Sequence, residues 1–149
     1  MRPSKDLVFM AVARLLAELA TCKKRRVGCV LTDATYHIVG HGYNGPPSGH
    51  SHCTEHDCGG GAAGSNTCRA VHAEVNALMN CPAVRSIHYC FTTTFPCLSC
   101  LKNLANTSCQ VIFYEEETEE TVEGLRRWRQ AGLKAIQLIH FDEDWPRSV

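Results

Sequence analysis

Beyond residue 86, apolar segments of strand length alternate with segments of helical periodicity, and this order constrains the fold more than any other feature of the sequence. The predicted order is a strand at residues 87–92, a helix at 97–105, a strand at 109–114, a helix at 115–130 and a strand at 134–141. Successive strands that are joined by a helix pair in parallel, because the chain must cross the sheet before it runs again in the same direction. The last three strands are therefore expected to form the parallel part of a sheet.

The first half of the chain adds a helix, a hairpin and a second helix. Apolar residues at helical spacing predict a helix over residues 6–19, with Ser4 as its N-cap. Residues 27–31 and 36–42 have extended patterns on either side of a turn, which predicts a hairpin. Residues 71–79 return to helical spacing. Together these elements predict an α/β fold in which a mixed five-stranded sheet lies between helices.

The composition suits a single domain of residues 1–149. With 44% hydrophobic and 20% charged residues, the chain can bury a core. Fifteen basic residues balance fifteen acidic ones, whereas a protein that binds long nucleic acid usually has a basic excess, so we expect no nucleic-acid partner. The apolar stretch at residues 7–20 is interrupted by Arg14 and Glu18, so we expect no membrane partner.

Ten cysteines and eight histidines are many for 149 residues. Such a content indicates either a secreted, disulfide-bonded protein or thiolate ligands for a metal in a reducing compartment. The N-terminal segment lacks the pure apolar run and the small-residue cleavage site of a secretory signal. Metal binding in the cytoplasm is therefore the favoured interpretation.

One group of residues has the spacing of a catalytic zinc site. His72 and Glu74 form a His-x-Glu pair, and Cys97 and Cys100 follow after a predicted strand as Pro-Cys-x-x-Cys, which is the signature of zinc-dependent nucleobase deaminases. Three protein ligands, His72, Cys97 and Cys100, leave a fourth tetrahedral position open for water, as in catalytic zinc sites. A structural zinc half-site or a redox pair would also contain Cys-x-x-Cys, but neither needs the His-x-Glu pair upstream.

Glu74 is predicted to be the catalytic proton carrier. Two residues beyond the ligand His72, it is close enough to take a proton from the water without ligating the metal. It would pass this proton to ring nitrogen 3 of a cytosine-type base, and the exocyclic amine would leave as ammonia. Ala73, between the two, keeps the space beside the base small.

Several further segments match one known family. They are Arg2-Pro3-Ser4, Phe9-Met10, Val27-Gly28, residues 42–49 (Gly-Tyr-Asn-Gly-Pro-Pro-Ser-Gly), residues 68–77 (Cys-Arg-Ala-Val-His-Ala-Glu-Val-Asn-Ala), Phe95-Pro96-Cys97 and residues 111–115. On these residues, from Arg2 to about Leu138, the chain resembles the deoxycytidylate (dCMP) deaminases. The resemblance implies a three-layer α/β/α cytidine-deaminase-like fold and zinc-dependent conversion of dCMP to dUMP and ammonia in pyrimidine nucleotide metabolism.

The resemblance also implies substrate-binding residues. Arg26 corresponds to the basic residue that meets the substrate phosphate, with the neighbouring residues 23–25 as competitors for this role. Asn44 should contact the sugar or base, although it could also be a turn residue beside a glycine. Tyr114 lies where a hydroxyl could assist, although packing within a strand would explain it equally well.

Members of the family are commonly hexamers, and the resemblance implies regulation by dCTP and dTTP together with Mg²⁺. The regulator would bind at subunit contacts near the segment of residues 42–49. The residues implied at this allosteric site are Gly42, Asn44, Gly45 and Gly49.

A long segment rich in Gly, His and Cys, residues 45–69, lacks apolar side chains that could hold it. A second, structural zinc would stabilise it, since Cys/His sites with four ligands supply folding energy. The predicted ligands are Cys22, Cys53, Cys58 and Cys68, with His52 or His56 as a substitute. The alternative is a mobile loop with free thiols. The remaining cysteines in apolar segments are expected to be buried as small hydrophobic residues: Cys29, Cys81, Cys90 and Cys109.

Three alternatives to a dCMP deaminase remain at this stage. The enzyme could deaminate dCTP as well as dCMP. It could act on cytosine or adenine in a nucleic acid, although the neutral net charge argues against a polymer substrate. It could be an interaction module held by zinc, although the open coordination position and Glu74 argue against that.

Overall fold

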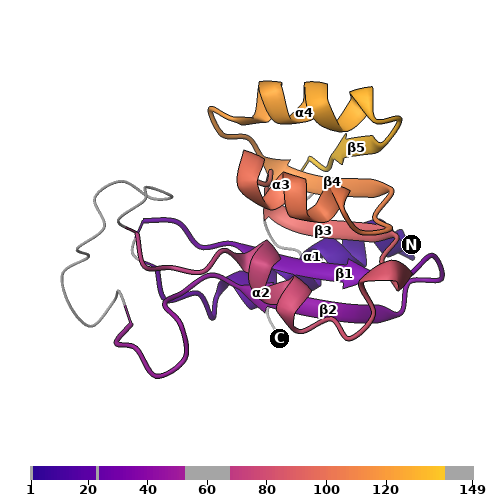
Figure 1. The fold of residues 1–149 in the computed structure, drawn as a ribbon. Helices are drawn as coiled ribbons and strands as arrows, with labels where there is room; N and C mark the ends of the chain where they lie inside the picture. Colours follow the sequence, from indigo (N-terminus) through magenta and orange to yellow (C-terminus); the bar gives the residue numbers. More distant parts are fainter. Residues whose placement is uncertain (1, 23, 53–67, 140–149) are drawn as a thin grey trace.

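The computed structural model describes residues 2–22, 24–52 and 68–139. Within these ranges the chain contains a single five-stranded sheet, four α-helices and one 3₁₀ turn at Val84–Ser86 (Figure 1). The strands are β1 (Gly28–Thr32), β2 (Ile38–Tyr43), β3 (Tyr89–Thr94), β4 (Val111–Glu116) and β5 (Lys134–Gln137). The helices are α1 (Lys5–Ala17), α2 (Ala73–Met79), α3 (Leu98–Ala105) and α4 (Thr121–Gln130). No helix of this described part is both long and apolar enough to cross a bilayer.

The sheet has the strand order β2-β1-β3-β4-β5. Strand β1 pairs antiparallel with β2 and with β3, whereas β4 pairs parallel with β3 and β5. The predicted hairpin and the predicted parallel strands are thus confirmed. The parallel strands arise because α3 and α4 carry the chain back across the sheet before each new strand begins.

Helices cover both faces of the sheet, so the predicted mixed sheet between helices is confirmed (Figure 1). Successive residues of β4 alternate between two cores, because side chains of a strand point to opposite faces. Val111 and Phe113 pack with Met10 and Ala13 of α1. On the other face, residues of β1, β3 and β4 pack with residues from α2, α3 and α4: Cys29, Leu31, Cys90, Ile112, Tyr114, Ala73, Ala77, Leu101, Leu104 and Trp128.

Element boundaries differ from the sequence prediction at the fourth helix. The helix predicted over residues 115–130 begins only at Thr121. Strand β4 instead continues through Glu116, whose carbonyl accepts a hydrogen bond from the Phe95 amide at 2.8 Å. The acidic residues that suggested a helix start therefore belong to the end of a strand and to the connection between β4 and α4. The predicted N-cap Ser4 is confirmed, since its hydroxyl accepts from the Leu7 amide.

Close approach of α2 to β2 depends on two glycines. A Cβ atom at Gly42 would lie 2.5 Å from the Ala77 amide nitrogen and 2.7 Å from the Ala73 carbonyl oxygen. A Cβ atom at Gly40 would lie 2.5 Å from the Ala77 carbonyl oxygen. Both distances are shorter than ordinary contact, so the helix that begins at Ala73 can rest on this strand only because the strand lacks side chains there.

Candidate active site

Two helix N-termini meet at the site. His72 is the N-cap residue of α2, and the chain reaches it through an isolated bridge between Gly45 and Val71. Cys97 is the N-cap residue of α3 and lies three positions after the end of strand β3, and its sulfur accepts a hydrogen bond from the Cys100 amide. Both N-cap residues have extended backbone angles, so their side chains lie beside the first turn of each helix. The helix dipoles favour negative charge at both starts, which suits thiolate ligands.

The predicted zinc ligands are brought together. The His72 Nδ1 atom lies 3.4 Å from the Cys97 sulfur and 3.3 Å from the Cys100 sulfur. All three ligand atoms lie within 4.8 Å of one another. Zinc bonded at about 2.3 Å to sulfur and about 2.0–2.1 Å to nitrogen would require a nitrogen–sulfur separation of roughly 3.6 Å in a tetrahedron. The donor atoms and their spacing therefore fit a zinc ion.

Electrostatics within this cluster favour the thiolate form of Cys97. A hydrogen bond from the Cys100 thiol and contact with the His72 ring together lower the pKa of Cys97 to about 4, against the effect of burial. The pKa of Cys100 is raised, because its proton bonds to the Cys97 sulfur and because it is buried. The same Cys97 sulfur raises the pKa of His72. Without a cation the cluster thus retains protons that a bound metal would displace.

Glu74 is a buried carboxyl next to this cluster, with only 4% of its surface exposed. Burial raises its pKa above the ordinary value, which suits a group that must both accept and release a proton. The Thr92 hydroxyl, fully buried on β3, lies 3.1 Å from Glu74 Oε1 and 2.9 Å from the Thr94 carbonyl oxygen, and its one hydrogen can be donated to either acceptor. Thr92 was not predicted from the sequence, because a threonine within an apolar strand gives no signal of such a contact.

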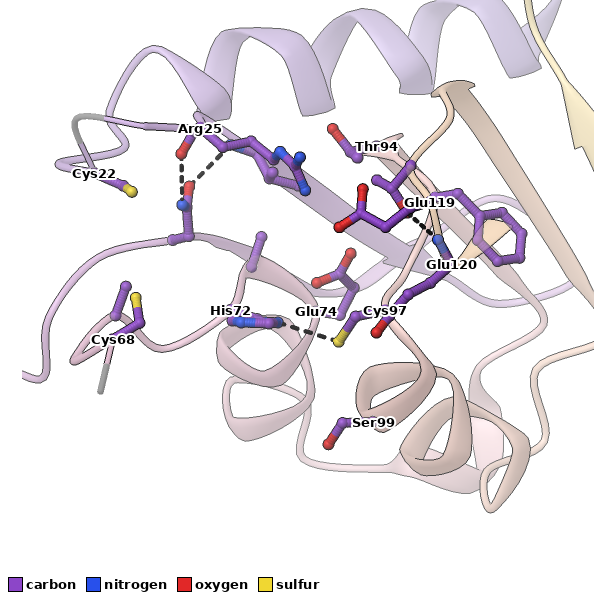
Figure 2. Close-up of a pocket in the computed structure, with 16 residues that line it drawn as sticks. Cys22, Arg25, Cys68, His72, Glu74, Thr94, Cys97, Ser99, Glu119 and Glu120 are labelled. Carbon is purple, nitrogen blue, oxygen red and sulfur yellow. Dashed lines mark hydrogen bonds between the residues drawn. The ribbon is translucent and has the colours of Figure 1, made fainter. Parts of the chain in front are cut away.

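Glu74 and the ligands line a cavity of about 510 Å³ (Figure 2). Its wall comes from the starts of α2 and α3, from the segment that precedes β1, and from the connection between β4 and α4. The other lining residues are Cys22, Arg25, Val27, Asn44, Cys68, Ala70, Ala73, Thr94, Phe95, Ser99, Thr118, Glu119 and Glu120. A cavity of this size with a buried acid at its base can hold a small polar molecule.

Asn44 lines the cavity and also holds the segment before β1. Its Oδ1 atom accepts from the Val27 amide at 2.8 Å, and its Nδ2 atom donates to the Arg25 carbonyl at 2.7 Å. Figure 2 shows the Arg25 side chain extending into the cavity from this segment. Arg26 points elsewhere, toward Glu18 at 3.6 Å, and is not among the lining residues. Of the basic run, the structure therefore brings Arg25 to the cavity and leaves Arg26 outside it.

Two other predicted substrate residues have different environments. Ala73 lines the cavity and is almost fully buried. Tyr114 is only 3% exposed, and its ring packs edge-on against Phe95 with centroids 5.0 Å apart. It lies in the core of the sheet rather than in the cavity wall, so the structure agrees with the alternative interpretation of packing within a strand.

The residues proposed for a regulator have separate structural tasks. Gly42 lies under α2, as described above, and Gly45 pairs with Val71. Gly49 has a φ of 85°, which favours glycine, and its position is open to solvent.

The second predicted metal site is described only in part. Cys22 and Cys68 both line the cavity, and His52 is exposed. Cys53, Cys58 and His56 lie outside the described residues. The eight cysteines of the described ranges form no disulfide, and Cys29, Cys81, Cys90 and Cys109 are buried as predicted.

The fold and the site define a class of α/β domains with a His-Cys-Cys metal site. Residues 3–116 match the family described as the cytidine and deoxycytidylate deaminase zinc-binding region, and the chain belongs to this family.

Named relatives agree with this family. A deoxycytidylate deaminase of Saccharomyces cerevisiae is 33% identical in an alignment of 157 residues that includes gaps. The alignment covers 100% of this chain and 49% of that protein. A deoxycytidylate deaminase of Schizosaccharomyces pombe is 37% identical over 148 residues, which cover 93% of this chain and 45% of that protein. The chain thus spans about half the length of these curated relatives.

A solved structure has the same arrangement of elements. The dCMP deaminase from the cyanophage S-TIM5, in complex with dCMP and dUMP, has a TM-score of 0.76 and 29% identity. The match covers 93% of this chain and 99% of that chain.

Proposed function

We propose that this chain catalyses the zinc-dependent hydrolytic deamination of dCMP to dUMP and ammonia. The observation that carries the proposal is the buried carboxyl of Glu74 beside the cluster of His72, Cys97 and Cys100 at the base of one cavity. The named activity of the yeast relatives and the nucleotides in the cyanophage structure support dCMP as the substrate.

His72 Nδ1 and the two cysteine sulfurs would hold the zinc ion. When bound, the ion lowers the pKa of a coordinated water from 15.7 to about 7 and so supplies a nucleophile at neutral pH. Glu74 then has two tasks: it passes one proton of the attacking water to ring nitrogen 3, and it passes the second proton of that water to the departing amine. The Thr92 hydroxyl orients the carboxyl for both tasks.

The cavity wall suggests how the nucleotide is held. Arg25 is the basic residue that we propose for the substrate phosphate, because it lines the cavity whereas Arg26 does not. A guanidinium can bind phosphate oxygens through two parallel hydrogen bonds. Asn44 would place Arg25 through the bonds described above, and its second amide hydrogen would be available to the sugar. Ala73 would lie beside the base.

Glu74→Gln tests the reaction. The variant should bind metal and fold, because the amide has the same shape, but it should release ammonia from dCMP about 10²–10⁴-fold more slowly. Glu117→Gln, on an exposed carboxyl outside the cavity lining, is the matched control and should retain activity. Substrates for comparison are dCTP, cytidine and a cytosine-containing oligonucleotide. Wild-type activity in Glu74→Gln, or faster turnover of the oligonucleotide than of dCMP, would contradict the proposal.

Arg25→Gln and Arg26→Gln test phosphate recognition. The first should raise KM for dCMP about tenfold or more, and should have little effect on deoxycytidine, which lacks the phosphate. Arg26→Gln should leave the KM for dCMP and for deoxycytidine unchanged. A raised KM for dCMP in Arg26→Gln and not in Arg25→Gln would instead indicate that Arg26 binds the phosphate.

We extend the proposal to a second zinc bound by Cys22, Cys53, Cys58 and Cys68. Its support is that Cys22 and Cys68, far apart in the sequence, line the same cavity. Elemental analysis should find two zinc ions per chain, and only one in a Cys22→Ser/Cys68→Ser double variant. One ion in the wild-type protein would contradict this part.

The resemblance further supports a cytoplasmic hexamer that is regulated by dCTP and dTTP with Mg²⁺. Asn44 connects the segment of residues 42–49 to the cavity, which offers a route from a regulator to the substrate. Light scattering measures the assembly, and dCMP saturation curves with and without each triphosphate measure the regulation. A monomer whose dCMP saturation curve is unchanged by dCTP and by dTTP would contradict this part of the proposal.

A further inference from the structure

The connection between β4 and α4 contacts the helix that carries two of the predicted zinc ligands. Glu120 Oε2 accepts a hydrogen bond from the backbone amide of Leu98 at 2.9 Å. Leu98 is the first residue of α3 and directly follows Cys97. Figure 2 shows the Glu120 side chain directed toward the Cys97 turn.

Glu120 occupies the N-cap position of α4 but does not cap its own helix. At such a position a side chain usually accepts from the first turn of the helix that follows it. Here the Glu120 carboxylate instead accepts a hydrogen bond from the first residue of another helix, α3. This use of the side chain indicates a role for Glu120 at α3.

Other bonds hold Glu120 in place. The Glu120 amide donates to the Thr118 hydroxyl at 3.2 Å, and the Thr118 amide donates to the Thr121 hydroxyl at 2.8 Å. One turn further along α4, Gly124 allows the helix to approach Phe95, since a Cβ atom there would lie 2.5 Å from the ring. The start of α4 is thus fixed against the segment that leads into Cys97.

The Leu98 amide is one of the first N–H groups of a helix, which have no partner within the helix. The Cys100 amide, another of these groups, bonds to the Cys97 sulfur at 3.5 Å. The orientation of the peptide between Cys97 and Leu98 is set by the Cys97 backbone, which also directs the Cys97 sulfur. A bond that holds this peptide therefore restrains a ligand sulfur.

We propose that Glu120 is a positioning residue of the zinc centre, which acts by holding the Leu98 amide so that Cys97 and Cys100 keep the geometry for metal binding. The proposal rests on the function proposed above, because it requires zinc on these two cysteines and His72. Groups that orient metal ligands typically change metal affinity by about 10–100-fold when they are removed.

Transfer of zinc to a chromophoric chelator measures this role without reference to activity. Glu120→Ala should release zinc about 10–100-fold faster than the wild-type protein. Glu120→Gln should restore most of the retention, because its amide oxygen can accept the same bond. Glu123→Ala is the matched control: it removes a carboxylate from the same turn of α4 that pairs with Arg126 and Arg127 instead of α3, and it should release zinc at the wild-type rate.

Cobalt substitution provides a second readout, because the thiolate-to-cobalt absorption bands depend on ligand geometry. These bands should shift or weaken in Glu120→Ala and not in Glu123→Ala. Equal zinc release by wild-type protein and Glu120→Ala, or equal acceleration by Glu120→Ala and Glu123→Ala, would overturn the positioning role. Failure of the wild-type protein to bind zinc through His72, Cys97 and Cys100 would instead overturn the proposed function itself.

Discussion

Replacement of Gly42 by alanine should displace helix α2. The new Cβ atom would lie 2.5 Å from the Ala77 nitrogen, so α2 must retreat by about 0.9 Å to restore an ordinary contact of 3.4 Å. The two nearest atoms, the Ala77 nitrogen and the Ala73 carbonyl oxygen, belong to the helix backbone, and the third is the Asn76 Cβ atom at 2.8 Å, so no flexible side-chain end can move away in their place. Overpacking of this kind costs about 1–3 kcal/mol of the free energy of unfolding. A misplacement of roughly 1 Å near reacting groups can reduce turnover about 100-fold.

The position of the contact along α2 provides the control. A Cβ atom at Gly42 would meet the Ala73 carbonyl, in the first turn of α2 next to His72 and Glu74, as well as the Ala77 amide, whereas a Cβ atom at Gly40 would meet the Ala77 carbonyl and Cys81 further along. Urea denaturation should show a similar loss of stability for Gly42→Ala and Gly40→Ala. Ammonia release from dCMP should show a much larger loss of kcat for Gly42→Ala. If Gly42→Ala retains wild-type kcat and stability, or if both variants lose kcat equally, the reasoning from displacement is refuted.

Three further predictions concern Glu74, an exposed turn and the metal. Thr92→Val should lower kcat for dCMP about 10–100-fold with little change in KM, because a hydrogen bond to a charged group contributes roughly 1.5–3 kcal/mol; an unchanged kcat would exclude an orienting role. The backbone amide of His37, with further bonds from Thr35, lowers the pKa of Asp33 to about 2. Since this value lies below that of the unfolded chain, about 3.9, Asp33 stabilises the fold above pH 4 and this contribution is lost as the pH falls toward 2. The difference in urea midpoint between wild type and Asp33→Asn should therefore be present at pH 6 and shrink by pH 2.5, and a constant difference would contradict the assignment. Dialysis against a chelator should abolish deamination and added zinc should restore it; activity that survives complete removal of zinc would contradict a catalytic metal.

Much of the fold could be predicted because its signals are local. Strands such as β3 and β4 are short apolar runs, and the helix between them begins just after the predicted Cys97. The start of α4 was predicted too early, because local charge could not show that Glu116 pairs in the sheet. That pairing depends on a partner strand far away in the sequence.

In the candidate site too, residues with local sequence signals could be predicted, and residues placed by distant contacts could not. His72, Glu74, Cys97 and Cys100 could be predicted, because two short motifs contain all four residues and the donor types of His72, Cys97 and Cys100 suit the ion. The choice between Arg25 and Arg26 could not, since neighbouring side chains on one segment point in different directions and Asn44 fixes which one reaches the cavity.

Thr92 and Glu120 could not be predicted either. Each acts through a single hydrogen bond to a residue 18 or 22 positions away, and nothing in the local pattern indicates that partner. Tyr114 shows the opposite case, in which a polar group that the family resemblance suggested for the site lies in the core.

The distance along the chain between the histidine and cysteine ligands has a consequence for folding. His72 and Cys97 are 25 positions apart, and the whole of β3 lies between them. An ion held by both would close a loop of that length, much as a covalent cross-link does. By the chain-entropy relation for such loops, closure would disfavour the unfolded ensemble by about 3–4 kcal/mol. The bound zinc ion would then also connect the antiparallel half of the sheet to its parallel half.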